Sequence, residues 1–135
     1  MQASAELTEG AGTAIAAESL YLVNLLLAPG LGFLALLWLW RRNRGSAPPL
    51  AAAHLAQTLS GSIWAGILLL VANGLILLLG GYQGPNVWIV VITYFTLCHS
   101  MLVVFGAFGL AKAMAGQCWR YPLIGRALPP GCGQR

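Results

Sequence analysis

Charged residues are scarce in this chain, and aspartate is absent. The 135 residues include three glutamates and seven lysines and arginines, so 7% are charged while 59% are hydrophobic. A typical soluble protein has roughly 25% charged residues, and ten charges do not cover the surface of a small soluble domain. Disorder is excluded too, because disordered segments combine low hydrophobicity with high charge. The composition therefore indicates a single integral membrane domain.

The same scarcity excludes most enzyme classes. All three glutamates lie in the first eighteen residues, so acid–base chemistry would depend on His54 or His99. No Gly-x-Ser-x-Gly, phosphate-loop or His-Glu-x-x-His motif occurs. A haem held between the two histidines is disfavoured because we expect their depths to differ by about 20 Å. We expect no catalytic residue, cofactor or metal site, and no nucleic-acid partner, because the basic residues flank apolar segments.

Uncharged runs define three expected transmembrane helices. Residues 19–40 and 45–111 carry no charge, and a helix needs about 20 apolar residues to span a bilayer. The first span is expected at Leu20 to Trp40, the second within Thr58 to Leu79, and the third from about Val87 to Met114. The turn at residues 80–86 is short and rich in glycine, so spans two and three should form an antiparallel hairpin.

The distribution of basic residues predicts an orientation. Arg41, Arg42 and Arg44 lie in the first loop, and four more basic residues follow the third span. Loops rich in lysine and arginine stay in the cytoplasm. We therefore expect an all-α, N-out/C-in protein of the bacterial inner membrane. Its parts would be a loose acidic leader (1–18), a three-helix transmembrane domain (19–116) and a cytoplasmic tail (117–135).

Two further absences concern processing and cysteine chemistry. No cleavable signal peptide is expected, because the leader is acidic. Cys118 and Cys132 fall on the expected cytoplasmic side, where structural disulfides are rare, so none is predicted between them. Neither cysteine has a histidine at metal-ligand spacing, and modification of Cys118 stays open.

His99 is the most notable polar residue of the predicted spans. It should lie near the middle of the bilayer, where an ionisable group is costly and marks a candidate functional site. Thr96 lies one turn away on the same helix. One interpretation is a proton relay or ligand group that faces a partner. The other is a neutral imidazole that hydrogen-bonds inside the bundle.

Other candidate contacts are structural in character. Asn24, Asn73 and the pair Thr93–Tyr94 are expected at similar depth, which favours an interhelical hydrogen-bond layer over a transport pathway. Ala107, Ala111 and Ala115 repeat at fourfold spacing, a pattern that permits close helix approach. We predict that His99 or this alanine stripe lies at a subunit contact.

From Ala28 to about Arg126 the chain resembles a small bacterial membrane family. The relevant segments are the basic cluster at 41–44 with the prolines after it, the polar start of the second helix (His54, Gln57, Thr58), and residues 112–116 and 119–122. This family is related to the smallest channel-like component of the chloroplast inner-envelope import machinery (Tic20-like). The resemblance implies topology and no activity.

These observations favour a non-catalytic accessory subunit that packs against a larger membrane complex. The alternative is a small homo-oligomeric transporter or protein-conducting element of the Tic20-like family. The expected partners are the lipid bilayer and other membrane subunits, and bound lipids are compatible with the apolar surface. The sequence does not name the complex.

Overall fold

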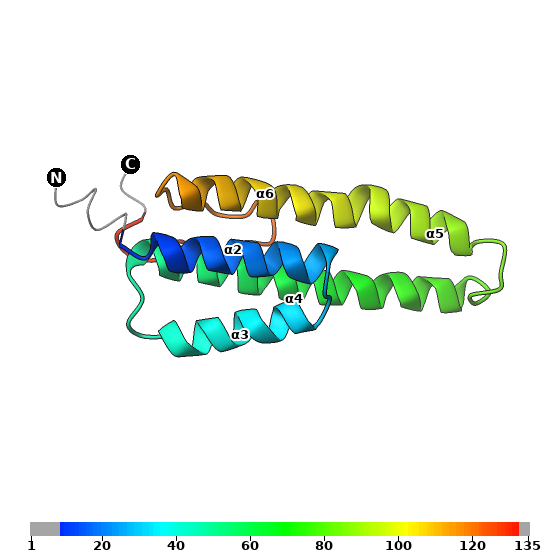
Figure 1. Ribbon diagram of the computed structural model, residues 1–135. Helices are drawn as coiled ribbons and strands as arrows, with labels where there is room; N and C mark the ends of the chain where they lie inside the picture. The colour runs from blue at the N-terminus through cyan, green and yellow to red at the C-terminus, as the bar shows by residue number, and fades with distance from the viewer. Residues whose placement is uncertain (1–8, 133–135) are drawn as a thin grey trace.

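The computed structural model describes residues 9–132, which form a helical bundle with an extended C-terminal tail (Figure 1). The helices are α2 (Ala11–Leu26), α3 (Leu31–Asn43), α4 (Pro49–Leu78), α5 (Val87–Thr93), η1 (Tyr94–His99) and α6 (Ser100–Met114). The last three follow one another without a break, and η1 is a π-helix.

The long hairpin predicted from spans two and three is confirmed. α4 and the α5–η1–α6 rod contain 30 and 28 residues, and both are long and apolar enough to cross a membrane. They run antiparallel along the whole molecule (Figure 1). A helix of 30 residues is about 45 Å long, so each rod is longer than the bilayer core of roughly 30 Å.

The predicted single span from Leu20 to Trp40 is wrong. The chain leaves the helix after Leu26, turns at residues 27–30, and returns as α3 beside α2 (Figure 1). Pro29 cannot continue the hydrogen-bond ladder of a helix, and Gly30 has a φ of 87°, which is unfavourable for other L-residues. The two helices are short and cover only the half of α4 that lies nearest to its N-terminus.

Because the chain reverses direction between α2 and α3, residues 9 and 132 lie at the same end of the bundle (Figure 1). Three spans would place them at opposite ends, so the fold does not fit the N-out/C-in prediction. The helix also begins at Ala11, inside the segment predicted as a loose leader. Residues 1–8 of that leader lie outside the described part of the chain.

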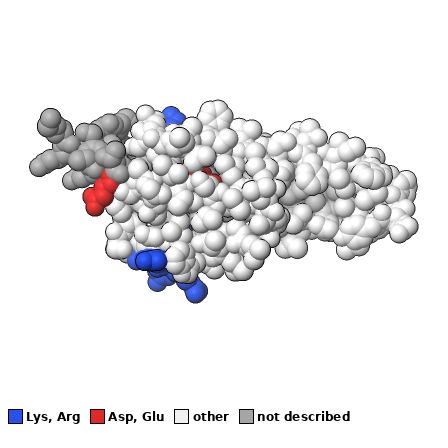
Figure 2. Space-filling model, viewed as in Figure 1, with Lys and Arg blue, Asp and Glu red and all other residues white. Residues whose placement is uncertain are grey.

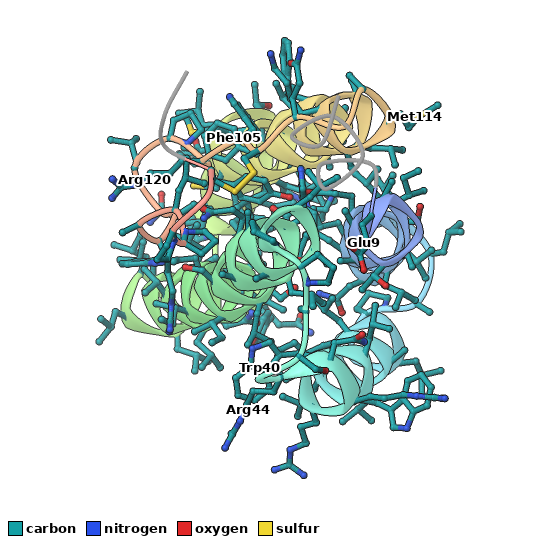
Figure 3. All side chains as sticks on the ribbon, turned by 90° about the vertical axis from the view of Figure 1, so that its left-hand side faces the viewer. Glu9, Trp40, Arg44, Phe105, Met114 and Arg120 are labelled. Carbon is teal, nitrogen blue, oxygen red and sulfur yellow. A yellow bond between two sulfur atoms is a disulfide. The ribbon has the colours of Figure 1, made fainter. Side chains whose placement is uncertain are left out.

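The tail folds back onto α4. Cys118 and Cys132 form a disulfide, with their Cα atoms 5.7 Å apart, so the expectation of unpaired cysteines is wrong. The Cys132 sulfur also lies 3.4 Å from the Pro49 carbonyl oxygen. Seen along the bundle, α4 lies between α2 on one side and the tail on the other (Figure 3). The sequence reading missed the pair because it judged the cysteines by compartment alone.

Candidate functional site

A buried polar cluster joins α2, α4 and the tail. Glu18 and His54 are both fully buried, and Glu18 Oε1 lies 2.6 Å from His54 Nδ1. The Tyr121 hydroxyl donates a hydrogen bond to the other carboxyl oxygen of Glu18. Tyr121 itself is 1% exposed. We call Glu18, His54, Tyr121 and Gln57 the buried polar cluster.

The hydrogen bonds fix how many protons the Glu18–His54 pair holds. His54 Nε2 lies 2.9 Å from the Gln117 carbonyl oxygen, and a carbonyl only accepts, so Nε2 carries a hydrogen. The contact between Nδ1 and Glu18 then contains one proton, which belongs either to the carboxyl group or to the imidazole. In both cases the pair has no net charge, which lowers the cost of burying it.

Gln57 completes the cluster by holding the tail. Its side-chain oxygen accepts from the backbone N–H groups of Tyr121 (3.2 Å) and Arg126 (3.0 Å). Its amide nitrogen donates to the Arg126 carbonyl at 2.8 Å. Ser60, one turn further along α4, donates to the Ile124 carbonyl at 2.6 Å. The polar start of α4 therefore satisfies backbone groups of an irregular tail that has few backbone partners of its own.

Glycines on α6 and α4 make room for the cluster. A side chain at Gly109 would collide with the Glu18 carboxyl group, and one at Gly106 would collide with Tyr21 and Leu22. Gly61 on α4 faces the rings of Tyr21 and Tyr121, whose centroids are 5.5 Å apart. The Tyr21 hydroxyl donates to the Leu102 carbonyl at 3.0 Å. α2 thus sits in a groove formed by small residues.

The cluster has the character of a structural site. Its carboxyl and imidazole groups have no exposed surface, and each has protein partners. Burial and the neighbouring Glu18 carboxyl group raise the pKa of the Tyr121 hydroxyl, so it stays protonated and remains a donor at physiological pH. A substrate has no route to these atoms in this conformation.

A second feature is an apolar cavity of about 560 Å³ where the α2–α3 hairpin ends, partly open to the surface. We call it the mid-depth cavity. It is lined by Asn24, Leu25, Pro29, Gly30, Phe33, Ser62, Ile63, Ala65, Gly66, Ile67, Leu69, Leu70, Tyr94, Phe95 and His99. Ser62 is part of this lining, but its hydroxyl oxygen is itself buried and has no hydrogen-bond partner within residues 9–132.

Comparison with known protein families identifies the relatives of this fold. Residues 12–128 match the MamF/MmsF family, described as the magnetosome magnetite crystal formation protein family. The chain belongs to this family. The match runs from the start of α2 into the tail and so includes every member of the buried polar cluster. No curated protein and no solved structure matches the chain.

Family membership agrees with the two long apolar helices, and this chain is a bacterial membrane protein. The predicted resemblance is confirmed at this level, because the MamF/MmsF proteins are a small membrane family related to the Tic20-like proteins. The family description adds magnetite crystal formation, which no motif in the sequence had indicated.

The predicted layer of asparagines is not formed in this MamF/MmsF protein. Asn24 Oδ1 accepts from the backbone N–H groups of Gly30 (2.9 Å) and Phe33 (3.1 Å), and so caps α3. Asn73 bonds to the Leu69 carbonyl and accepts from the Tyr82 hydroxyl at 2.6 Å. The layer was expected on the assumption that Leu20 to Trp40 is one helix. The chain instead turns at residues 27–30, and Asn24 bonds to that turn and to the start of α3.

The other predicted contacts lie on the outside of the bundle or at the cavity. Thr96 is exposed, and His99 lines the mid-depth cavity with its ring against Phe95 at a centroid distance of 5.2 Å. Ala107, Ala111 and Ala115 are exposed in the monomer. Their assignment as partner contacts stays a prediction.

Sequence reasoning missed the buried polar cluster. Glu18 was assigned to a loose leader, and His54 was considered as a haem ligand, as an acid–base group and as part of the polar start of the second helix, but not as a partner of Glu18. The available signal was spacing: His54, Gln57 and Gly61 share one face of α4, and Ala14, Glu18 and Tyr21 share one face of α2. Within residues 9–132, no three His, Cys, Asp or Glu side chains come together as a metal site would require.

Proposed function

We propose that this chain is a non-catalytic membrane component of magnetite crystal formation that packs against other membrane proteins. The observation that carries the proposal is the family match, which covers residues 12–128 and thus almost the whole described fold. The local chemistry supports a structural role within that process, for the reasons that follow.

The acidic groups of the chain support a role without direct mineral contact. Glu18 is sealed inside the buried polar cluster, and Glu9 is the one other acidic residue within residues 9–132. Iron ions are bound by clustered carboxylate, imidazole or thiolate ligands. A chain with one exposed carboxylate in its described part is better suited to organising neighbours than to holding iron or a crystal face.

The surface of α6 supports a partner contact. Ala107 and Ala111 lie one turn apart on its exposed face, and small residues let a second helix approach closely in a bilayer. The distal half of α4 and the α5 segment also expose large apolar side chains, among them Leu78 and Trp88. Figure 2 shows this half free of charge on the face in view. Both surfaces suit lipid or another membrane helix.

The orientation proposed here has two spans and both chain ends on one side of the membrane. The basic residues assign that side to the cytoplasm, whereas the Cys118–Cys132 disulfide is typical of an oxidising compartment, and we give more weight to the basic residues. Four basic residues lie at the end of the bundle that holds both chain ends: Arg41, Arg42, Arg44 and Lys112. Arg120 and Arg126 lie on the tail that folds back along α4, where the Arg126 backbone bonds to Gln57. Arg42 stacks over Trp38 at 5.3 Å and Arg44 over Trp40 at 5.2 Å. Such aromatic and basic residues anchor a protein at the cytoplasmic interface. The membrane is the bacterial inner membrane or the magnetosome membrane derived from it.

The test replaces the chromosomal copy with the parent chain, Ala111→Leu or a matched control, Gly74→Leu. Gly74 faces open space on α4, so leucine there changes apolar surface without touching the alanine stripe. We expect all three chains to insert. Parent and Gly74→Leu should co-purify with partner subunits in mild detergent and support normal crystals by electron microscopy, whereas Ala111→Leu should lose both.

If Ala111→Leu retains its partners and its crystals, the contact is not on this face. If the parent purifies only as a homo-oligomer, the accessory role is wrong and the homo-oligomeric alternative gains support.

A further inference from the structure

The outward face of α3 changes in character from one end of the helix to the other. Leu31, Leu34 and Trp38 follow one another at helical spacing and are 70%, 60% and 58% exposed. Arg41 and Arg42 come next along the same face, and both are exposed. The face is therefore apolar at the start of α3, aromatic in its last turns and basic at its end.

The length of this face matches one leaflet of a bilayer. From Leu31 to Arg41 the helix rises about 15 Å, which is half of a hydrocarbon core of roughly 30 Å. α3 begins at the turn of residues 27–30, partway along the long hairpin, and ends where the loop to α4 begins (Figure 1). In the two-span placement, its leucines thus lie among acyl chains and its arginines lie at the headgroups.

The arginines at this end have no acidic partner in the described part of the chain. Within residues 9–132 the one ion pair joins His54 to Glu18, and Glu9 is the other acidic residue. Arg44, just after the helix, adds a third exposed guanidinium group. Figure 2 shows basic side chains gathered over this end of α3. Unpaired cations that lie so close together attract an anion from outside the chain.

Two tryptophans limit the positions of these guanidinium groups. The Arg42 guanidinium carbon lies 5.3 Å from the Trp38 ring centroid, and that of Arg44 lies 5.2 Å from the Trp40 ring centroid (Figure 3). Trp40 packs in turn against the buried core cluster that includes Leu36. A guanidinium group that stacks on a ring keeps the N–H groups at its edge for an acceptor, and its fork matches two oxygens of a phosphate.

A phospholipid fits all of these features together. A free phosphate ion pairs with the arginines but leaves the apolar part of the face unused. An acidic peptide has the same defect, because Leu31 and Leu34 lie at the depth of the acyl chains. A phospholipid presents acyl chains, esters and phosphate in the order in which α3 presents leucine, tryptophan and arginine. A headgroup amine adds positive charge beside the arginines, so a headgroup without an amine fits better.

We propose that the outward face of α3 binds an anionic phospholipid, with its acyl chains along Leu31 and Leu34 and its phosphate at Arg41 and Arg42. The bound lipid holds the end of α3 at the headgroups, although the helix is too short to span the bilayer. This inference rests on the two-span placement proposed above and does not depend on the role in crystal formation.

The test titrates the purified full-length chain in mild detergent with phosphatidylglycerol and counts bound lipid by native mass spectrometry. Phosphatidylcholine with the same acyl chains is the comparison lipid, and glycerol phosphate and a hexaglutamate peptide are soluble competitors. Arg41→Gln/Arg42→Gln removes two charges from the face. Arg120→Gln/Arg126→Gln is the matched control, because it removes the same charge from exposed positions on the tail.

We expect the parent to bind phosphatidylglycerol roughly tenfold more tightly than phosphatidylcholine. An arginine beside an anionic headgroup contributes about fivefold in affinity, so Arg41→Gln/Arg42→Gln should raise the Kd roughly twentyfold and lose the preference. The tail control should stay within about twofold of the parent. Leu34→Ser leaves every charge in place and should still raise the Kd by about threefold, because it removes an acyl-chain contact.

Equal affinity of the parent for the two lipids would overturn the proposal. The same holds if Arg41→Gln/Arg42→Gln binds as tightly as the tail control, since the lipid would then lie elsewhere. Displacement of the lipid by equimolar glycerol phosphate would assign the arginines to a soluble phosphate. Displacement by the equimolar peptide would assign them to an acidic protein segment.

The placement is measured separately, with Gly12→Cys and Ser46→Cys, each in a Cys98→Ala chain, and an impermeant maleimide added to one side of sealed membranes. Labelling of both from the same side without a lipid preference would contradict the lipid site and leave the two-span placement intact. Labelling from opposite sides would contradict the placement and, with it, the site that rests on it.

Discussion

Glu18 and His54 are among the few ionisable side chains in a chain that is otherwise mostly apolar, and the fold hides both of them. Two isolated charges at such a position would cost several kcal/mol each. A pair that shares one proton at 2.6 Å, with Tyr121 and the Gln117 carbonyl as further partners, avoids most of that cost. The geometry makes the pair a connector of α2, α4 and the tail.

Substitutions of Glu18 and of His54 should therefore lower the free energy of unfolding by different amounts. Glu18→Gln keeps both bonds, because its amide nitrogen donates to His54 Nδ1 and its oxygen accepts from Tyr121, and we expect the free energy of unfolding to fall by no more than about 1 kcal/mol. His54→Leu leaves the Glu18 carboxyl group buried without its main partner, and we expect a loss of about 3–5 kcal/mol. Thermal unfolding in detergent measures both. Equal stability of His54→Leu and the parent would show that the pair is not a connector.

The Asn24 side chain hydrogen-bonds to backbone N–H groups that lie deep in the bundle. It accepts from two N–H groups at the start of α3, where no water is expected to replace it. Asn24→Ala should lower the free energy of unfolding by about 2 kcal/mol. Asn73→Ala is the control, since its bonds lie at an exposed position, and should cost less than about 0.5 kcal/mol. Similar losses for the two variants, measured in the same detergent, would contradict the capping role.

At the scale of elements, the α2–α3 hairpin determines where the core lies. Its helices have 16 and 13 residues, or about 24 Å and 20 Å, and neither spans a bilayer core of roughly 30 Å. The fully buried side chains, such as Tyr21, Leu36 and Leu50, gather in the half of the molecule that this hairpin covers. The other half of the long hairpin exposes its apolar side chains.

Close packing of α2 against α6 depends on Gly106 and Gly109 of α6. A methyl group at Gly109 collides with the Glu18 carboxyl group, so Gly109→Ala should destabilise the fold by about 1–3 kcal/mol. Gly74→Ala, on an open face of α4, should instead stabilise it by roughly 0.5–1 kcal/mol because alanine favours the helix. Unfolding curves of the two variants should shift in opposite directions. A shift of both toward higher stability would mean that α2 is not seated against α6.

The sequence predicted the long hairpin well because each of its helices is a long run of apolar residues bounded by glycine or proline. It predicted the first helix badly because 22 uncharged residues satisfy the length rule whether they cross the bilayer or turn back within it. Pro29 and Gly30 lie inside this run and end the helix, and the length rule takes no account of them. The capping bonds of Asn24 and the fit of Glu18 against Gly109 depend on tertiary contacts, and these are not visible in a single sequence.

At the scale of the whole molecule, the return of α2–α3 leaves two helices within residues 9–132 that are long and apolar enough to cross a membrane, where the sequence predicted three. Both described chain ends, the loop after α3 and the disulfide-linked tail then lie together, and the turn at residues 79–86 lies alone at the far end (Figure 1). On the face in view, the lysine and arginine side chains lie in the half of the molecule nearer to the first of these ends (Figure 2). The orientation stays a prediction, whereas the predicted number of long spans, three, differs from the two that the structure shows within residues 9–132.

Accessibility of single cysteines to a membrane-impermeant maleimide tests this central claim most directly. Gly12→Cys, Ser46→Cys and Gln83→Cys are placed one at a time in a Cys98→Ala chain that keeps the Cys118–Cys132 disulfide, and the unsubstituted Cys98→Ala chain gives the background. All three positions are exposed in the monomer. With two crossings, Gly12→Cys and Ser46→Cys react from the same side of the membrane and Gln83→Cys from the other. Labelling of Gly12→Cys together with Gln83→Cys, and opposite to Ser46→Cys, would restore the three-span topology and contradict the fold described here.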